Sequence, residues 1–328
     1  MRGLSYKFAL YCEVYLINHN VSSGHATSQK RDDIDKLAIG RYNNIMKGGV
    51  ILMSEFDTRE RELDKYRGFP VVKHNDIIQK ARFNLTTQEQ KIILFLISKI
   101  NSTGEDLPDL WFDIKEFCEV CDINYHGNYN FLRNSIKSLA DKSIWVKQDV
   151  IYNGKIEEEE SLLRWFHDVY VYSRSGKIKV MFHDKMKPYL IGLIKNFTRY
   201  ELLNILGMKS QYAIRLYELF KSYAFKNKIS ISLDDLKRML MAEKLYSNFF
   251  DFRKNVLNIA INEINRVSDI NVSWEVSGRK GKKVTELVFR IKEKTSHEKL
   301  IALEQTKDVV MPWVQEKLDL TGGENEND

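Results

Sequence analysis

Apolar residues at helical and strand spacing divide residues 68–190 into elements that follow one another in a distinct order. Thr86 and Glu89 stand three residues apart ahead of an apolar run, which is the spacing of a capping box and predicts a helix over residues 90–100. A loop follows over residues 101–108. The elements predicted after this loop are a strand over 110–114, helices over 115–121 and 130–142, and strands over 144–150, 165–172 and 177–182.

Three details of this first half follow from the same pattern. The third helix is expected to turn Phe131, Ser135, Ile136 and Leu139 inward. The last two strands are joined by Ser173-Arg174-Ser175-Gly176, which has the composition of a hairpin turn. The acidic run Glu157–Glu160 is expected to lie in an exposed loop, as a solvated segment.

The same order recurs over residues 197–294. The predicted elements are a helix over 210–226, a strand over 229–233, a helix over 234–242, a long helix over 248–267, and strands over 270–276 and 284–291. The order of helix, short strand, helix, helix and β-hairpin is the winged-helix plan, a helix-turn-helix with a hairpin wing. We therefore predict an α+β fold with two tandem winged-helix domains.

The chain is expected to have four parts. The two winged-helix domains are assigned to residues 67–190 and 191–295, between a poorly organised leader over 1–66 and an acidic tail over 296–328. Met46 and Met53 are alternative start sites, and use of either would leave much of the leader outside the translated protein. The leader lacks the pattern of a signal peptide.

Composition narrows the class of protein. A chain of 328 residues is too long for a single ordinary core, and 43% hydrophobic residues exclude wholesale disorder. Three Cys cannot form a disulfide framework, and no apolar run approaches the roughly 18 residues of a membrane span, so we expect a cytoplasmic protein with no membrane partner. The net charge of +6 is only mildly basic, so binding to a polyanion has to be argued from where the charges lie.

The helix predicted over residues 248–267 carries the strongest functional signal. Its apolar stripe consists of Phe249, Phe252, Val256, Ala260, Ile264 and Val267, and its opposite face holds Asp251, Lys254, Asn255, Asn258, Asn262 and Asn265. Asn disfavours helices, so four Asn on one face suggest a purpose beyond solvation. Asn can pair with adenine and Lys with guanine, which makes Lys254, Asn255, Asn258 and Asn262 candidate DNA base contacts. The alternative is an ordinary polar face in solvent.

Basic residues flank this helix in the predicted hairpin. The turn over residues 277–283 contains Arg279, Lys280, Lys282 and Lys283 and no acidic residue, and we expect these side chains, with Arg253, to contact the DNA backbone. The first half has a sparser version of the same pattern. There the candidate backbone contacts are Arg133 and Lys137 on the third helix and Arg174 and Lys177 at the hairpin, with Lys179 beside them.

Several catalytic classes do not fit the sequence. It has no P-loop run and no His-apolar-His pair of a metal-dependent nicking enzyme, so no catalytic residue, cofactor or metal site is predicted. Cys118 and Cys121 have the spacing of half a zinc site, but without a second pair they are expected to pack in the core. Glu263, near the apolar side of its helix, needs a partner, and Arg215 is the candidate for a structural ion pair.

Residues 71–294 resemble the replication initiator (Rep) proteins of iteron-bearing plasmids, of which the F-plasmid initiator is typical. The resemblance rests on five segments, which are Leu85-Thr86-Thr87-Gln88-Glu89-Gln90-Lys91, Phe197-Thr198-Arg199-Tyr200, Ser210-Gln211-Tyr212-Ala213-Ile214-Arg215-Leu216-Tyr217-Glu218-Leu219, Phe252-Arg253-Lys254-Asn255-Val256-Leu257 and Glu263-Ile264-Asn265. Together these segments are specific, whereas each one alone is not.

The resemblance implies a function and a set of partners. Such initiators bind direct repeats (iterons) in double-stranded origin DNA, open the origin, recruit the host replication initiator and replicative helicase, and control plasmid copy number. They also switch between a self-repressing dimer and an active monomer. Lys254 and Asn255 stand where the family presents base-contacting residues, and Asn255 replaces an Arg that is common in relatives. The alternatives are a winged-helix transcriptional repressor and, less favoured, a DNA-nicking replication enzyme that uses a Tyr.

Overall fold

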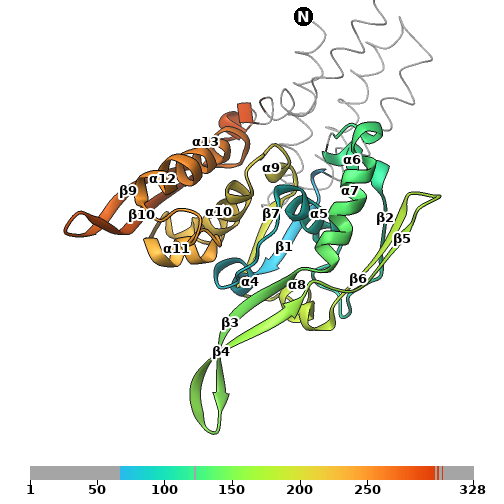
Figure 1. The fold of residues 1–328 in the computed structure, drawn as a ribbon, viewed down its shortest axis with the longest axis horizontal. Coiled ribbons are helices and arrows are strands. Elements are labelled where there is room, and N and C mark those ends of the chain that lie inside the picture. Colours follow the sequence, from blue (N-terminus) through green and yellow to red (C-terminus); the bar gives the residue numbers. More distant parts are fainter. Residues whose placement is uncertain (1–66, 122, 300, 303–304, 306–328) are drawn as a thin grey trace, which may run out of the picture. The chain divides into compact units, whose positions relative to one another are not determined.

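The computed structural model describes residues 67–121, 123–299, 301–302 and 305 (Figure 1). The predicted leader over residues 1–66, with its alternative start sites, lies outside the described residues, as does most of the predicted tail. Within the described part of the chain, no helix is both long enough and apolar enough to cross a membrane.

The first winged helix has the predicted order of elements. Its helices are α5 (Thr87–Ser98), α6 (Ile114–Cys121) and α7 (Tyr125–Ala140), and its strands are β2 (Leu110–Asp113), β5 (Phe166–Tyr172) and β6 (Lys177–Phe182). The three strands form an antiparallel sheet in the order β2-β6-β5. Phe95 on α5 packs edge-on against Phe112 and Phe117, which joins the helices to the sheet in one core.

The capping box at the start of α5 is confirmed. The Thr86 hydroxyl accepts a hydrogen bond from the Glu89 backbone N–H, and the Glu89 carboxylate accepts one from the Thr86 N–H at 2.8 Å. The same carboxylate also accepts from Ser138 and Lys142, at the end of α7 and just after it. Glu89 therefore fixes both the start of α5 and the packing of α7 beside it.

The second winged helix repeats the order. Its helical segments are α10 (Gln211–Ser222), η3 (Ala224–Lys226), α11 (Leu233–Met239), α12 (Phe249–Phe252), the π-helix η4 (Arg253–Leu257) and α13 (Asn258–Val267); its strands are β8 (Lys228–Ser232), β9 (Ile270–Lys280) and β10 (Lys283–Glu293). The strands form an antiparallel sheet in the order β8-β10-β9. The predicted pair of winged-helix domains is thus confirmed.

The acidic run Glu157–Glu160 was expected in a loop, and that prediction is wrong. These residues are exposed, but they lie in β4 (Lys155–Arg164), which pairs along its whole length with β3 (Ser143–Tyr152). The two strands form a separate hairpin, inserted between α7 and β5, that projects from the rest of the winged helix (Figure 1). Asn153 and Gly154 form the turn of this hairpin, and both residues have positive φ. The turn and the cross-strand pairing together outweigh the low preference of Glu for strands.

The third helix of the first domain differs from the prediction in start and in facing. It begins at Tyr125, five residues early, because Asn124 accepts a hydrogen bond from the His126 N–H and caps it. Phe131 is 57% exposed and Ser135 is half-buried, so both were wrongly placed inward, whereas Ile136 and Leu139 are buried as predicted. Leu132, one residue after Phe131, takes the inward position.

Short elements join the two winged helices. The strand β1 (Pro70–His74) pairs with β7 (Phe197–Glu201), and α4 (Asn75–Gln79) follows β1. The remaining short elements are η2 (Asp184–Met186), α8 (Lys187–Leu190) and α9 (Leu203–Leu206). Because β1 and β7 are over a hundred residues apart in sequence, the start of the described chain is tied to the segment that leads into α10.

Candidate nucleic-acid interface

The helical segment over residues 249–267 has one buried and one exposed face, as its spacing predicts. The stripe from Phe252 through Val256, Ala260 and Ile264 to Val267 is buried, and Phe249 at its start is half-buried. The predicted base-contacting residues all lie on the exposed face, and these are Lys254, Asn255, Asn258 and Asn262. Arg253 is exposed beside them.

A π-helical turn interrupts this segment where the basic residues begin. In η4 the Asn258 N–H bonds to the Arg253 carbonyl, so the turn holds one residue more than an α-helical turn. Arg253, Lys254 and Asn255 are then exposed in succession, and Val256 and Leu257 are both buried. The Arg253 guanidinium lies 5.5 Å from the ring centre of Phe250, which holds its charge near the start of the exposed face.

Asn265 is not part of that face, which corrects the predicted row of four outward Asn. Its side chain accepts a hydrogen bond from the Val272 N–H at 2.6 Å and donates one to the Val272 carbonyl at 2.9 Å. Asn265 therefore fastens the end of α13 to β9. Three Asn, at positions 255, 258 and 262, remain exposed for contact.

The hairpin of β9 and β10 is longer and its turn tighter than predicted. The strands run on to Lys280 and from Lys283, so only Gly281 and Lys282 form the turn, and Gly281 has φ +60°. Gly278 lies beside a register shift in the pairing, where an added Cβ would come within 2.8 Å of the Glu286 Cβ, so only Gly fits.

The basic residues of this wing are all exposed, namely Arg279, Lys280, Lys282 and Lys283. The Lys283 ammonium lies 3.8 Å from the Asp234 carboxylate. Both groups are well exposed, so the surrounding water weakens the attraction between them. The wing is held to the helical segment by Trp274, whose ring packs edge-on against Phe249 at 6.1 Å. The basic wing and the amide-bearing helix thus belong to one packed unit.

The predicted ion pair between Glu263 and Arg215 is absent. Glu263 accepts hydrogen bonds from the Lys209 and Ser210 N–H groups, both at 3.0 Å, ahead of α10. Arg215 donates to the Ile78 and Ala81 carbonyls, and its nearest carboxylate is that of Glu218, at 3.9 Å. Both residues have a structural role, but each has a different partner.

In the first winged helix, some of the candidate backbone contacts are less exposed or already have partners within the protein. Arg133 on α7 donates to the Ser173 hydroxyl at 2.7 Å, so α7 and the β5–β6 turn are neighbours, and the Arg133 side chain is half-buried. Lys137, Arg174 and Lys177 are exposed. Lys179 is paired with Asp109 at 2.6 Å, and this hydrogen bond is the main cause that raises its pKa.

Cys118 and Cys121 are buried, as the core interpretation predicts. Burial raises the pKa of the Cys118 thiol to about 12, so it stays protonated at neutral pH. Among the described residues, no group of three or more His, Cys, Asp or Glu side chains is placed to hold a metal ion.

Known proteins show the same two-part organisation. Residues 70–221 match the family model "Initiator Replication protein, WH1", and residues 232–291 match "Initiator Rep protein, WH2". A replication initiation protein of Escherichia coli is 25% identical over 220 residues, which are 64% of this chain and 66% of that protein. The PI protein of Escherichia coli is 32% identical over 155 residues, which are 42% of this chain and 50% of that protein. The matches therefore span about half to two thirds of these relatives.

A solved structure has the same fold. The crystal structure of the Pi initiator protein in complex with iteron DNA superimposes with a TM-score of 0.57 at 21% identity, covering 70% of this chain and 98% of that one. At that identity the likeness concerns the fold. The two matched modules, in this order and in this fold, show that the chain belongs to the family of initiator replication (Rep) proteins with two winged-helix domains.

Proposed function

We propose that this protein is a sequence-specific DNA-binding initiator of plasmid replication that acts on direct repeats in an origin. The observation that carries the proposal is the helical segment over residues 249–267, with its buried stripe and its exposed row of Arg253, Lys254 and three Asn. An exposed helix of this kind can enter the major groove, where amide and ammonium groups pair with base edges.

The basic residues around this helix have a different part in the proposal. The wing side chains neutralise phosphates and so set position and affinity, whereas the helix reads bases. Arg133, Lys137, Arg174 and Lys177 add backbone contacts from the first winged helix. Two unlike DNA-binding modules in one chain suit a composite or tandem site. The Pi initiator protein, which shares the fold, is seen in complex with iteron DNA, and this supports direct repeats as the target.

The work of the protein would be done with binding energy and without a covalent step. Binding to several repeats would favour an opened origin, and the bound protein would recruit the host replication initiator and helicase. Direct repeats about two helical turns apart beside the gene would support this function, whereas a lone palindrome there would favour a repressor. Relaxation of supercoiled origin DNA by the protein with a divalent metal would contradict the proposal by revealing a nicking enzyme.

The base-reading role is tested by Lys254→Ala and Asn258→Ala. Each change should weaken binding to the cognate repeat by roughly 1–3 kcal/mol and binding to random DNA much less, because each removes a side chain that pairs with a base edge. Lys244→Ala, an exposed Lys ahead of the helix, is the control. Titrations of each variant on both DNAs give the measurement, and equal losses of affinity on the two would contradict base reading.

A further inference from the structure

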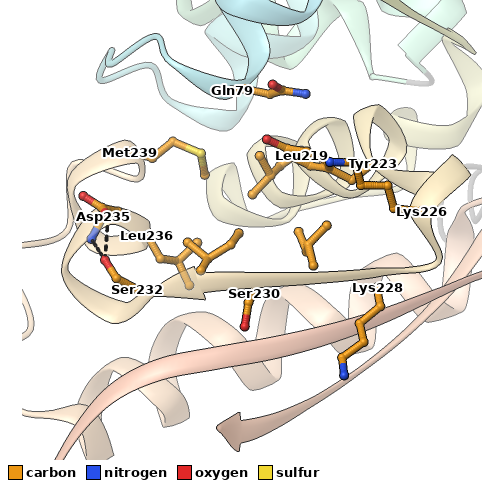
Figure 2. A pocket seen from close by; sticks show the side chains of 12 residues that line it. Gln79, Leu219, Tyr223, Lys226, Lys228, Ser230, Ser232, Asp235, Leu236 and Met239 are labelled. Atoms are coloured by element: carbon orange, nitrogen blue, oxygen red, sulfur yellow. Dashed lines mark hydrogen bonds between the residues drawn. The ribbon is translucent and has the colours of Figure 1, made fainter. Parts of the chain in front are cut away.

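A pocket of about 470 Å³ opens beside β8 (Figure 2). Helices α10 and α11 supply most of its apolar lining, with Leu219, Leu236 and Met239 facing it, and α4 adds Gln79. The strand β8 pairs with β10 along one edge, and no strand in the described part of the chain pairs with the other. The pocket therefore has a floor of largely buried apolar side chains and a polar rim, and it lies beside an open strand edge.

The two ends of this pocket differ in charge. Lys226 and Lys228 lie at one end, and Ser232 and Asp235 lie at the other (Figure 2). Lys228 is exposed, and Lys226 extends over its neighbour Phe225, with 5.6 Å from the ammonium to the ring centre. Along β8 from its start, the pocket is thus basic, then apolar, and it ends at Asp235, which is paired with Arg238 at 2.6 Å.

The β3–β4 hairpin offers a surface of matching size and pattern. Ile151 and Ile156 face each other next to the turn and are 81% and 78% exposed, although isoleucines gain free energy from burial. From the turn toward the base, β4 presents Lys155, then Ile156, then the run Glu157–Glu160. This strand is therefore basic, then apolar, then acidic.

The order of charges fixes one orientation. If β4 lies antiparallel to β8, Lys155 comes to the Asp235 end, Ile156 to the apolar middle, and the Glu run to Lys226 and Lys228. Backbone groups along the open edge of β8 would then pair with β4, as in other cases of strand addition. A parallel arrangement would instead place Lys155 beside Lys226 and Lys228, and the Glu run away from them.

The occupant of the pocket has to come from a second molecule. Each arm of the hairpin has ten residues paired along their length, so the tip stands roughly 30 Å from the base and cannot fold back. The four Glu exclude DNA phosphates as the partner, and hairpin-to-hairpin contact would bring two acidic rows together. The β8 pocket suits this hairpin because its basic end can pair with the Glu run and its apolar middle can cover Ile156.

We propose that the β3–β4 hairpin of one copy docks in the β8 pocket of a second copy, with β4 extending the β8 edge. The contact joins two different surfaces, so it can repeat from one copy to the next in a single direction. Copies bound to direct repeats all point the same way along the DNA, so a contact that repeats in one direction can join them. In this respect the inference rests on the proposed function.

Disulfide trapping tests the docking itself, without DNA. One variant has Ile156→Cys, at an exposed position, and the other has Ile231→Cys, at a half-buried position that lines the pocket. Both variants also have Cys12→Ser. Mild oxidation of the mixture should give a cross-linked dimer that is absent from either variant alone. No dimer in the mixture, or as much dimer from the Ile156→Cys variant alone, would overturn the proposal; the second result would reveal hairpin-to-hairpin contact.

Charge exchange tests the docking on DNA. Glu158→Lys with Glu160→Lys, or Lys226→Glu with Lys228→Glu, should each reduce cooperative binding to two direct repeats at least several-fold and leave single-repeat affinity unchanged. An equal mixture of the two variants should restore part of the cooperativity, because reversed hairpins then meet reversed pockets.

The outcomes separate this inference from the proposed function. Failure of the unaltered chain to bind a single repeat would count against the proposed function, and the trapping experiment would still decide the docking. Cooperativity unaffected by both charge variants, with no trapped dimer, would overturn the inference.

Discussion

Two buried or half-buried charges in the second winged helix act on the ends of helices to which they do not belong. Glu263 on α13 accepts from two backbone N–H groups ahead of α10, where a negative charge is favoured by the helix dipole. Lys294, after β10, donates to the Asn265 and Ser268 carbonyls at the end of α13, where a positive charge is favoured. Each charge therefore fixes how one element packs on the next.

The thiols of α6 give a prediction at the same scale. In a Cys12→Ser variant only Cys118 and Cys121 remain, and neither should react with a thiol reagent at pH 8 in the native protein. A rise of the Cys118 pKa from 9.0 to about 12 lowers its thiolate fraction about a thousandfold, and only the thiolate reacts. Colorimetric counting of thiols before and after addition of urea measures this, and fast native labelling would contradict the buried assignment.

At the scale of elements, the sequence predicted regular, one-sided patterns well. The helical segment over 249–267 was found because its apolar stripe recurs over five turns, and α5 because its capping box is local. The predictions that were wrong concern residues whose structure depends on partners in another element. The β4 strand exists because β3 pairs with it, and no local pattern in Glu157–Glu160 indicates that pairing. Asn265 does not lie on the predicted exposed face for the same reason, because its side chain bonds to two backbone groups of β9.

The wing provides the prediction for this scale. Replacing Lys280 and Lys282 by Gln should weaken binding to all DNA sequences alike, because these exposed tip residues would contact phosphates. The slope of log affinity against log salt should fall by just under two, since each neutralised phosphate adds about 0.9 to it. Replacing Lys115 and Lys195, exposed elsewhere, should leave the slope unchanged. An unaltered slope in the Lys280/Lys282 variant would remove the wing tip from the interface.

At the scale of the whole described chain, α10 is shared between the two winged helices. On one side Arg215 donates to the carbonyls of Ile78 and Ala81 and lies 4.1 Å from the Phe83 ring centre. On the other side Tyr217 donates to the Asp269 carboxylate, between α13 and β9. The predicted division between residues 190 and 191 stays a prediction, since the strand pairing of β1 with β7 crosses it.

A buried cluster of Glu218, Tyr200 and Lys73 lies where α10 meets β1 and β7, and it is expected to stabilise this junction. Glu218 on α10 accepts from the Tyr200 hydroxyl at 2.6 Å and pairs with Lys73 of β1, and all three side chains are buried. Burial lowers the pKa of Lys73, and the Glu218 carboxylate opposes this effect. Glu218→Gln leaves Lys73 without its counter-charge, which should reduce the free energy of unfolding by about 3–5 kcal/mol.

Urea unfolding can show whether both winged helices depend on this cluster. Trp165 lies in the core of the first winged helix, and the half-buried Trp274 packs against Phe249 in the second, so variants that keep one or the other report each module by fluorescence. Because Glu218 connects β1 and β7 to α10, both signals should shift to lower urea together. Glu293→Gln, which removes a mostly exposed partner of Lys221, should shift neither by more than about 1 kcal/mol. A shift in only one signal would mean that α10 belongs energetically to a single winged helix.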